Sequence, residues 1–435
     1  MNKGFVVILA TILVLSAGLV IILSAGYVSL NNIKAVRNNL YSVQAYYAAE
    51  AGIEDSLLRL LDPDMEDPNP AGYSLTTGEA NATLEISKDP IARSYTIISE
   101  GDKSNRIRKI TIILKITTTN VSFHYGVQIG EGNLTMDSGS KVYGNIYSNG
   151  RIVGSSNTKI YGDVYSASSS GKIDKLKVLK SSPEAEDGNA HANTISDSNI
   201  ANGAYYQTII STTAGSYFPG SPDSPVEQMP ISKEEILNWK NSAAPPLGEE
   251  RDSYLLGGND EDSLGPVKIN GSLTLASNAV LTMTGTIWVT GSIILESNAV
   301  LQLDSTYGAL SDVIVADGKI LLDSNIIICG SEGYNKGTKK CNPSASSYLM
   351  LLSTDNSLDP RNPAILSKSN AATAVLYTNQ GIIVLDSNSK LKEATAYALH
   401  LNSNAEVTYE TGLANAQFTS GPGASYQVVE WKEIE

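Results

Sequence analysis

The stretch that decides the fold is Gly271-Ser-Leu-Thr-Leu-Ala-Ser-Asn278-Ala-Val-Leu281, which recurs as Gly291-Ser-Ile-Ile-Leu-Glu-Ser-Asn298-Ala-Val-Leu301. Further copies of the motif end at the asparagines Asn157, Asn325, Asn388 and Asn404. In one more copy, Gly139 stands where the asparagine is expected. Glycine and asparagine are the residues that most readily adopt a left-handed backbone, so this position predicts a turn with positive φ.

The repeat predicts a parallel β-solenoid, also called a β-helix. Apolar residues at the third and fifth places of the motif point to one side of a short strand. A period of roughly 16 to 20 residues is typical of one solenoid rung. We expect a right-handed coil, because left-handed ones usually show strict hexapeptides. A β-sandwich is the alternative, but it would not need one motif at rung spacing. The turn residues would form a ladder along one edge: Asn278, Asn298, Asn325, Asn388 and Asn404.

Two blocks of rungs are expected, a first block over 121–180 and a main solenoid over 266–435. The residues between them, 181–265, are acidic and rich in Pro, Ser and Asn, which predicts a loop-rich insertion. The segment from Val428 to Lys432 predicts a strand that closes the end of the solenoid, since exposed sheet edges invite aggregation.

One short helix is predicted inside this insertion, over 231–241. Ser232 and Glu235 have the spacing of a capping box, in which each residue satisfies the other's backbone N–H. We expect Trp239 to anchor this helix in a core rather than to bind a ligand.

The N-terminal part of the chain predicts one long helix from Phe5 to Leu61. Residues 5–30 carry no charge and would span roughly 39 Å, enough to cross a ~30 Å hydrocarbon layer. This length is a poor match for an ordinary secretory signal, whose apolar region has about 7–15 residues, and argues against a buried core helix. Because Lys3 is the only charge ahead of it, we expect the N-terminus to stay cytoplasmic and the rest to be exported.

The helical pattern continues past the membrane segment over 31–61. Apolar residues keep helical spacing through a polar sequence, beginning with Ile33, Val36, Leu40, Val43 and Tyr47. No proline occurs before Asp62-Pro63, which predicts the helix end. Residues 62–120 change to strand patterns separated by turn signals, so a small antiparallel sheet packed on the helix is expected.

Lys3, Gly4 and Phe5 resemble the processing signal of the type IV pilin superfamily, in which a short basic leader ends in Gly before Phe and a long helix. The resemblance implies that residues 1–4 are a leader, cut between Gly4 and Phe5 by a prepilin peptidase, and that the new amino group of Phe5 is methylated. It also implies an α+β module of helix and sheet reaching to about residue 120.

A second block, Ala49-Glu50-Ala51-Gly52, looks like the PilX-type minor pilin family. Major pilins carry a glutamate five residues into the mature chain, and here that position is Leu9. The absence of this glutamate removes one docking contact and one carboxylate that would be costly in lipid. The tip pseudopilins of type II secretion lack it too, so the resemblance implies a minor, initiating or tip subunit, pilin- or pseudopilin-like.

Composition and cysteine usage agree with an exported protein. The formal charge is −14 and the sequence pI is about 4.8, which argues against a nucleic-acid partner. Cys329 and Cys341 are the only cysteines, and in an exported chain they predict a disulfide that closes the loop between them. That loop is either a recognition tip or a simple staple.

Catalytic and metal chemistry find little support in the sequence. The three histidines, His124, His191 and His400, have no metal-ligand spacing, so no metal site or cofactor is expected. An acidic run from Asp62 to Asp67 lacks the glycine of a calcium loop and is interpreted as linker. A row of Asp304, Asp323 and Asp386 on stacked rungs is the only catalytic candidate; Asp in such turns more often caps the backbone.

The sequence therefore predicts a non-enzymatic, pilin-like subunit with a solenoid head in the inner membrane, crossing it once with its C-terminus outside, and at the cell surface when assembled. It would prime a type IV pilus or display its head at the tip for adhesion. Expected partners are the prepilin peptidase, other pilins through the helix, membrane lipid and a surface or glycan ligand. The alternative is a membrane-anchored solenoid adhesin that never enters a filament; an anchored polysaccharide-active enzyme ranks third.

Overall fold

The computed structural model describes residues 3–61, 72–89, 94–116, 118–120, 123–245, 248–343, 347–368, 375–419 and 426–434. The chain forms two compact units. The first contains the N-terminal 115 residues together with the segment from Tyr426 to the C-terminus, and the second runs from Ile116 to Ser425. The acidic run Asp62–Asp67 and the predicted helix stop at Asp62-Pro63 lie outside the described residues.

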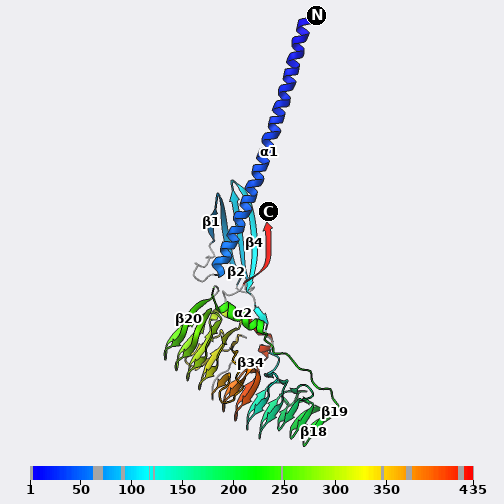
Figure 1. Cartoon of the computed structure of the whole chain (residues 1–435), viewed down its shortest axis with the longest axis vertical. Coiled ribbons are helices and arrows are strands. Elements are labelled where there is room, and N and C mark those ends of the chain that lie inside the picture. The colour runs from blue at the N-terminus through cyan, green and yellow to red at the C-terminus, as the bar shows by residue number, and fades with distance from the viewer. Residues whose placement is uncertain are drawn as a thin grey trace. The chain divides into compact units, whose positions relative to one another are not determined.

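The first unit is one long helix laid on a five-stranded sheet (Figure 1). Helix α1 spans Lys3–Leu61, beginning two residues before the predicted start at Phe5 and ending where predicted, and its C-terminal third covers the sheet. The strands are β1 (Tyr73–Thr77), β2 (Ala80–Asp89), β3 (Ser94–Lys103), β4 (Arg106–Ile116) and β39 (Tyr426–Ile434), in the spatial order β1-β2-β3-β4-β39. Strands β1 to β4 pair antiparallel. This confirms the expected α+β module of a long helix and a small antiparallel sheet.

The C-terminal strand corrects one prediction. Strand β39 borders β4 in the sheet of the first unit, and Glu433 accepts an ion pair from Arg108 of β4 at 3.0 Å. It therefore does not close the solenoid, and the predicted boundary 266–435 for the main solenoid is too long. The physical reason is again that an exposed sheet edge invites aggregation, but the edge that β39 covers is that of β4 in the first unit.

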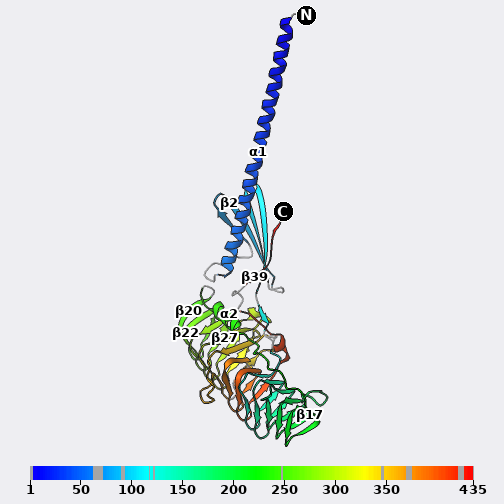
Figure 2. The ribbon, with the colours of Figure 1, turned by 45° about the vertical axis from the view of Figure 1, so that its right-hand side comes forward.

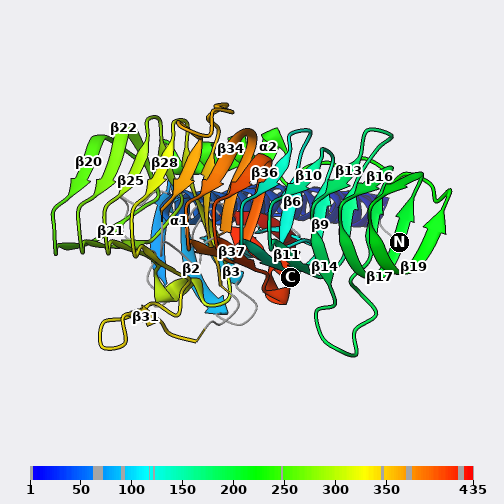
Figure 3. The same cartoon turned by 90° about the horizontal axis from the view of Figure 1, so that it is seen from below.

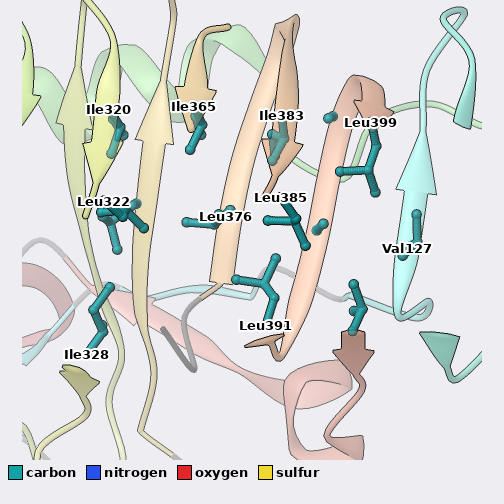
Figure 4. Packing of buried hydrophobic residues seen from close by; sticks show 14 of the residues in the cluster. Val127, Ile320, Leu322, Ile328, Ile365, Leu376, Ile383, Leu385, Leu391 and Leu399 are labelled. Atoms are coloured by element: carbon teal, nitrogen blue, oxygen red, sulfur yellow. The ribbon is translucent and has the colours of Figure 1, made fainter. Parts of the chain in front are cut away.

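The second unit is a parallel β-solenoid, so the predicted fold class is confirmed. Its strands are two to eleven residues long, and inward apolar residues alternate with outward polar ones, as in Leu134, Val142 and Ile152. Neighbouring rungs pair in register, for example Leu273 with Ile293 and Val280 with Val300. Figure 4 shows the inward side chains stacked in one continuous core. The handedness of the coil stays a prediction.

The strands of the solenoid follow the chain in two runs. The first run is β6 (Val127–Ile129), β7 (Leu134–Met136), β8 (Lys141–Tyr143), β9 (Ile146–Ser148), β10 (Ile152–Gly154), β11 (Lys159–Tyr161), β12 (Val164–Ser166), β13 (Lys172–Asp174), β14 (Lys177–Leu179), β15 (Ala190–Ala192), β16 (Thr194–Ser196), β17 (Asn199–Tyr206), β18 (Thr208–Ile210) and β19 (Thr213–Pro219).

The second run is β20 (Glu249–Leu256), β21 (Glu261–Leu264), β22 (Val267–Leu275), β23 (Val280–Met283), β24 (Ile287–Val289), β25 (Ile293–Leu295), β26 (Val300–Leu303), β27 (Asp312–Ala316), β28 (Ile320–Leu322), β29 (Ile327–Cys329), β32 (Leu349–Ser353), β33 (Ile365–Ser367), β34 (Val375–Leu385), β35 (Lys390–Leu391), β36 (Glu393–Leu401) and β37 (Glu406–Thr408). Two short strands, β5 (Thr118–Asn120) near the start of this unit's chain and β38 (Gln417–Thr419) near its end, pair antiparallel with each other.

The rungs do not stack in the order of the sequence. The last rung, β36 and β37, pairs with the first, β6 to β8, as in Leu399 with Leu134 and Val407 with Val142. Figure 3 shows β36 beside β6 near the middle of the row, with β20 at one end and β19 at the other. The chain thus enters the solenoid in its middle, coils to one end, crosses to the opposite end and coils back.

The predicted loop-rich insertion over 181–265 is wrong. Residues 190–219 form the strands β15 to β19, which continue the first block of rungs, and residues 249–264 form β20 and β21, which begin the second. Among the described residues of this range, loop structure is found over 180–189, in the crossing segment before α2 and in short links between strands. Rungs built from three-residue strands rich in Ser, Asn and Gly have a loop-like composition, which explains the error.

The predicted short helix is confirmed as α2 (Lys233–Ala243). Its capping box is present, since the Ser232 hydroxyl accepts from the Glu235 N–H and the Glu235 carboxylate accepts from the Ser232 N–H. Trp239 is buried, as expected, in a second apolar cluster on the outer face of the solenoid with Tyr377 and Phe418.

Candidate functional site

The first half of α1 is uncovered. From Ile8 to Leu30 its large apolar side chains are all more than half exposed, and it is the one described helix long and apolar enough to cross a membrane. Figure 2 shows this part of the helix extending beyond the sheet of its own unit. Exposing so many apolar side chains to water is unfavourable by roughly 1.5–3 kcal/mol each, so this surface requires lipid or other helices around it.

A narrower apolar stripe continues along the second half of α1. Ile33, Val36, Leu40, Val43 and Tyr47 are spaced alternately three and four residues apart, and each is at least half exposed. This is the heptad spacing that places side chains on one seam facing a partner helix. We call these five residues the heptad stripe. No part of the described chain covers it.

The opposite face of the same helix segment packs on the sheet. Ala45, Ala48 and Ala49 are fully or almost fully buried there, and the helix backbone approaches β3 closely. A Cβ at Gly101 would lie 1.9 Å from the Ala45 carbonyl oxygen, and a Cβ at Gly52 would lie 2.4 Å from the Ser99 hydroxyl oxygen. The small residues of the block Ala49-Glu50-Ala51-Gly52 therefore allow close helix-on-sheet packing, while Glu50 and Ala51 are half-buried at its margin.

Polar contacts hold the helix to the sheet at the edges of this packing. Arg108 Nε donates to Ser42 Oγ at 2.8 Å, and Arg106 Nη2 donates to Asn38 Oδ1 at 3.1 Å. Near the helix end, Asp55 accepts from Arg59 at 2.8 Å and from the Tyr73 hydroxyl at 2.7 Å. Burial raises the pKa of Asp55, but these two hydrogen bonds outweigh it and leave the pKa lowered.

The predicted processing residues Lys3, Gly4 and Phe5 lie in the first turn of α1. Their side chains lie outside the described residues, as do Met1 and Asn2, so cleavage and methylation stay predictions. Leu9 is described and is 58% exposed, in the same apolar surface as its neighbours. The surface at this position therefore has no carboxylate to pair with a neighbouring chain.

The predicted asparagine turns are present. Asn278, Asn298, Asn325, Asn388 and Asn404 all have φ between 61° and 65°. The rungs are joined there by backbone hydrogen bonds, such as that from the Asn298 N–H to the Ser324 carbonyl oxygen at 3.0 Å. Among the members of the same column that the sequence did not predict are Lys175, Asp197 and Ser211, with φ of 56°, 47° and 47°. Only their place in the stack identifies them, because none is Asn or Gly.

The predicted disulfide is formed between Cys329 and Cys341, whose Cα atoms lie 5.4 Å apart. It closes a loop containing the short hairpin β30 (Tyr334–Asn335) and β31 (Lys340–Cys341). Tyr334 and Lys339 of this loop line a groove of about 530 Å³ together with Asn278, Asn298 and Asn325. Two separate predictions, the asparagine ladder and the clipped loop, thus meet at one surface.

The acidic row proposed for catalysis is not assembled. Asp304 caps a 3₁₀ turn by accepting from the Thr306 N–H. Asp323 and Asp386 lie in the column of asparagine turns and accept from the following backbone N–H groups of Ser324 and Ser387. All three aspartates therefore cap backbone N–H groups, which is the structural role that the sequence offered as the alternative to catalysis. Among the described residues no group of three His, Cys, Asp or Glu side chains is placed to hold a metal ion.

Aromatic stacking, which the sequence did not suggest, uses one of the histidines. His191 lies between Tyr165 and Tyr205, with ring centroids 4.6 and 4.1 Å away. The stack continues to Tyr147 on one side and to Phe218 on the other. Burial lowers the pKa of His191. His400 lies elsewhere, with its Nε2 3.1 Å from Asp137 Oδ2.

The chain segment that crosses between the two ends of the solenoid lies over part of this stack. The Tyr147 hydroxyl donates to the Pro225 carbonyl oxygen, and Asn149 exchanges two hydrogen bonds with the backbone of Glu227. Burial, with the nearby Glu227 carboxylate, raises the pKa of Tyr147 to about 12. The aromatic stack is thus a structural support for the crossing segment.

Comparison with known proteins adds little. No protein-family model matches this chain, and no curated protein matches it. Among solved structures, one match is the crystal structure of the competence-associated pilin ComZ from Thermus thermophilus. The two chains are 11% identical, and the match covers 91% of this chain and 97% of that one with a TM-score of 0.24. At this TM-score the two structures do not superpose as a whole.

Proposed function

We propose that this protein is a pilin-like subunit, anchored in the inner membrane by the first half of α1 and assembled into a filament through the same helix. The heptad stripe carries the proposal. A simple membrane anchor needs no apolar seam beyond the bilayer, whereas a subunit that packs helix against helix does.

The solenoid suits a rare or terminal position in such a filament. We propose a minor, PilX-type role, in which the subunit primes assembly or displays the solenoid at the tip for adhesion to a surface. Leu9 supports this role, because an apolar residue there removes one contact between neighbouring chains. We also propose that the protein is not an enzyme, since Asp304, Asp323 and Asp386 cap backbone N–H groups.

The first test is the N-terminus of the native protein. Intact mass and N-terminal sequencing of sheared surface filaments are expected to give a chain that begins at methylated Phe5. A chain that still begins at Met1 and is found only in membranes would overturn the filament proposal in favour of the membrane-anchored solenoid adhesin.

A second test addresses the heptad stripe itself. Because both native cysteines are paired, Leu40→Cys would introduce a single free thiol in the stripe. A thiol-reactive benzophenone attached to Leu40→Cys is expected to photo-cross-link to neighbouring subunits in filaments, and one attached to Ala35→Cys, an exposed position on another face of the helix, is expected to give few cross-links. Equal cross-linking at both positions would contradict a specific seam.

A further inference from the structure

Three lysines form a column on the outer face of the solenoid. Lys141 of β8, Lys159 of β11 and Lys177 of β14 are paired in register on consecutive rungs. Each precedes an inward residue, Val142, Ile160 and Val178 respectively, so the lysines point outward. Neighbouring strands lie about 4.8 Å apart, and the column therefore repeats a positive charge at that spacing.

This column is electrostatically unfavourable by itself. Like charges directly opposite each other on neighbouring strands destabilise a sheet. Within the described residues none of the three lysines forms an ion pair. At one end of the column, Glu406 lies in register with Lys141, but its carboxylate is 3.8 Å from Lys390. The chain as a whole carries a net charge of −14, so these three lysines form a locally positive surface on an acidic protein.

The surroundings extend the basic surface into a groove. Lys175 and Lys177 line a groove of about 580 Å³, together with the side chains of Asn157 and Asn199 and several hydroxyl groups. Asp197 is the acidic residue in this lining. Within 141–180 the other basic residues are Arg151, Lys172 and Lys180, and the acidic ones are Asp163 and Asp174.

Two tyrosines flank the column. Tyr143 and Tyr161 follow Lys141 and Lys159 on the same face, and their rings stack on each other with centroids 4.6 Å apart and planes 6° from parallel. Both tyrosines are partly buried. It offers no free gap between rings for a nucleobase, although base stacking on aromatic faces supports most sequence-independent binding of single-stranded nucleic acid.

We propose that the column of Lys141, Lys159 and Lys177, with its adjoining groove, binds a linear acidic polysaccharide whose successive carboxylates pair with successive lysines. A chain with one charge per sugar repeats its carboxylates on the length scale of the rungs. The hydroxyl and amide groups of the groove suit sugar hydroxyls. The inference does not depend on filament assembly, since the site lies wholly within the solenoid.

The test uses the full-length protein in detergent and measures affinity for a linear oligogalacturonate. We expect binding that weakens as salt rises, because counterions compete for the lysines. The triple variant Lys141→Gln, Lys159→Gln, Lys177→Gln is expected to lose at least tenfold in affinity. A matched control, Lys233→Gln, Lys339→Gln, Lys340→Gln, removes the same charge from exposed positions elsewhere and is expected to bind as the parent does.

Competing ligands decide the class of partner. A neutral maltodextrin of equal length is expected not to bind. Tighter binding of single-stranded DNA or of polyphosphate, lost in the same triple variant, would overturn the polysaccharide assignment and make the column a site for that polyanion. No binding of oligogalacturonate, or an equal loss in the control variant, would overturn the site altogether.

Discussion

Asp312 predicts an unusual pH dependence for the stability of the solenoid. Its side chain is completely buried and accepts hydrogen bonds from Thr286 Oγ1 at 2.7 Å, from the Tyr307 hydroxyl at 2.5 Å and from the Val313 N–H at 2.7 Å. Burial raises the pKa of Asp312 from an ordinary value of 3.8 to about 7, although these hydrogen bonds lower it in part. Below about pH 7 the protonated form is therefore favoured in the folded chain.

The sign and size of the effect follow from linkage. A carboxyl group whose pKa is raised by folding contributes stability that is fully present below pH 3.8 and is lost as the pH rises to about 7. Three pKa units correspond to about 4 kcal/mol of unfolding free energy. Asp312→Asn keeps the shape of the side chain and removes the titration. The variant is expected to match the parent near pH 4 and to exceed its stability by up to about 4 kcal/mol at pH 8.

Denaturant unfolding of the full chain in detergent, followed by tryptophan fluorescence from pH 4 to pH 8, measures this difference. A Trp431→Phe background restricts the signal to Trp239 and Trp288, which both lie in the second unit. The exposed Asp359→Asn is the control, and its effect on stability is expected not to change with pH. An Asp312→Asn variant that is equally shifted at pH 4 and pH 8, or less stable at pH 8, would refute the reasoning.

Three further perturbations test other parts of the molecule. Gly101→Val would drive a side chain into the backbone of α1 and should destabilise the first unit by about 1–3 kcal/mol. Amide hydrogen exchange is expected to become faster in β3, with unchanged protection in the solenoid. An unchanged exchange rate in β3 would show that the contact between Gly101 and α1 is not tight. Replacing both cysteines by serine removes roughly 3 kcal/mol of loop-closure stabilisation. Proteolysis near Gly337 is expected to become faster, while the circular dichroism of the solenoid is unchanged. An unchanged cleavage rate would show that the hairpin keeps its structure without the disulfide. Tyr147→Phe removes the hydrogen bond to the Pro225 carbonyl oxygen, which contributes about 1 kcal/mol, and should speed amide hydrogen exchange in the crossing segment. Tyr161→Phe is the control, because the Tyr161 ring stacks on Tyr143 instead, and it should leave that exchange rate unchanged.

Features encoded over a few residues were predictable. The uncharged run over 5–30, the helical spacing beyond it, the capping box at Ser232 and the asparagine turns each depend on a residue and its near neighbours in the chain. The disulfide also followed, since only two cysteines occur and they flank one loop. In each case the interaction that forms the structure lies within one helix, one turn or one loop.

The order of the rungs could not be predicted in the same way. Any rung with inward Leu, Ile or Val can stack on any other, so the pairing of Leu399 with Leu134 leaves no mark in either local sequence. The same holds for β39, whose alternating pattern fits an edge of either unit. Rungs over 190–219 were mistaken for loop because small polar residues suffice when rungs above and below supply the hydrogen bonds.

By itself, then, the sequence determined the elements of this protein: a long helix with an apolar first half and a heptad stripe, a small antiparallel sheet, and repeated solenoid rungs that turn at a left-handed residue. Only the tertiary structure decided which rungs are neighbours, that the chain enters the solenoid in its middle, and that Lys141, Lys159 and Lys177 form one column. The reason is physical. Backbone preference and periodicity act over a few residues, whereas pairing between strands joins residues hundreds of positions apart.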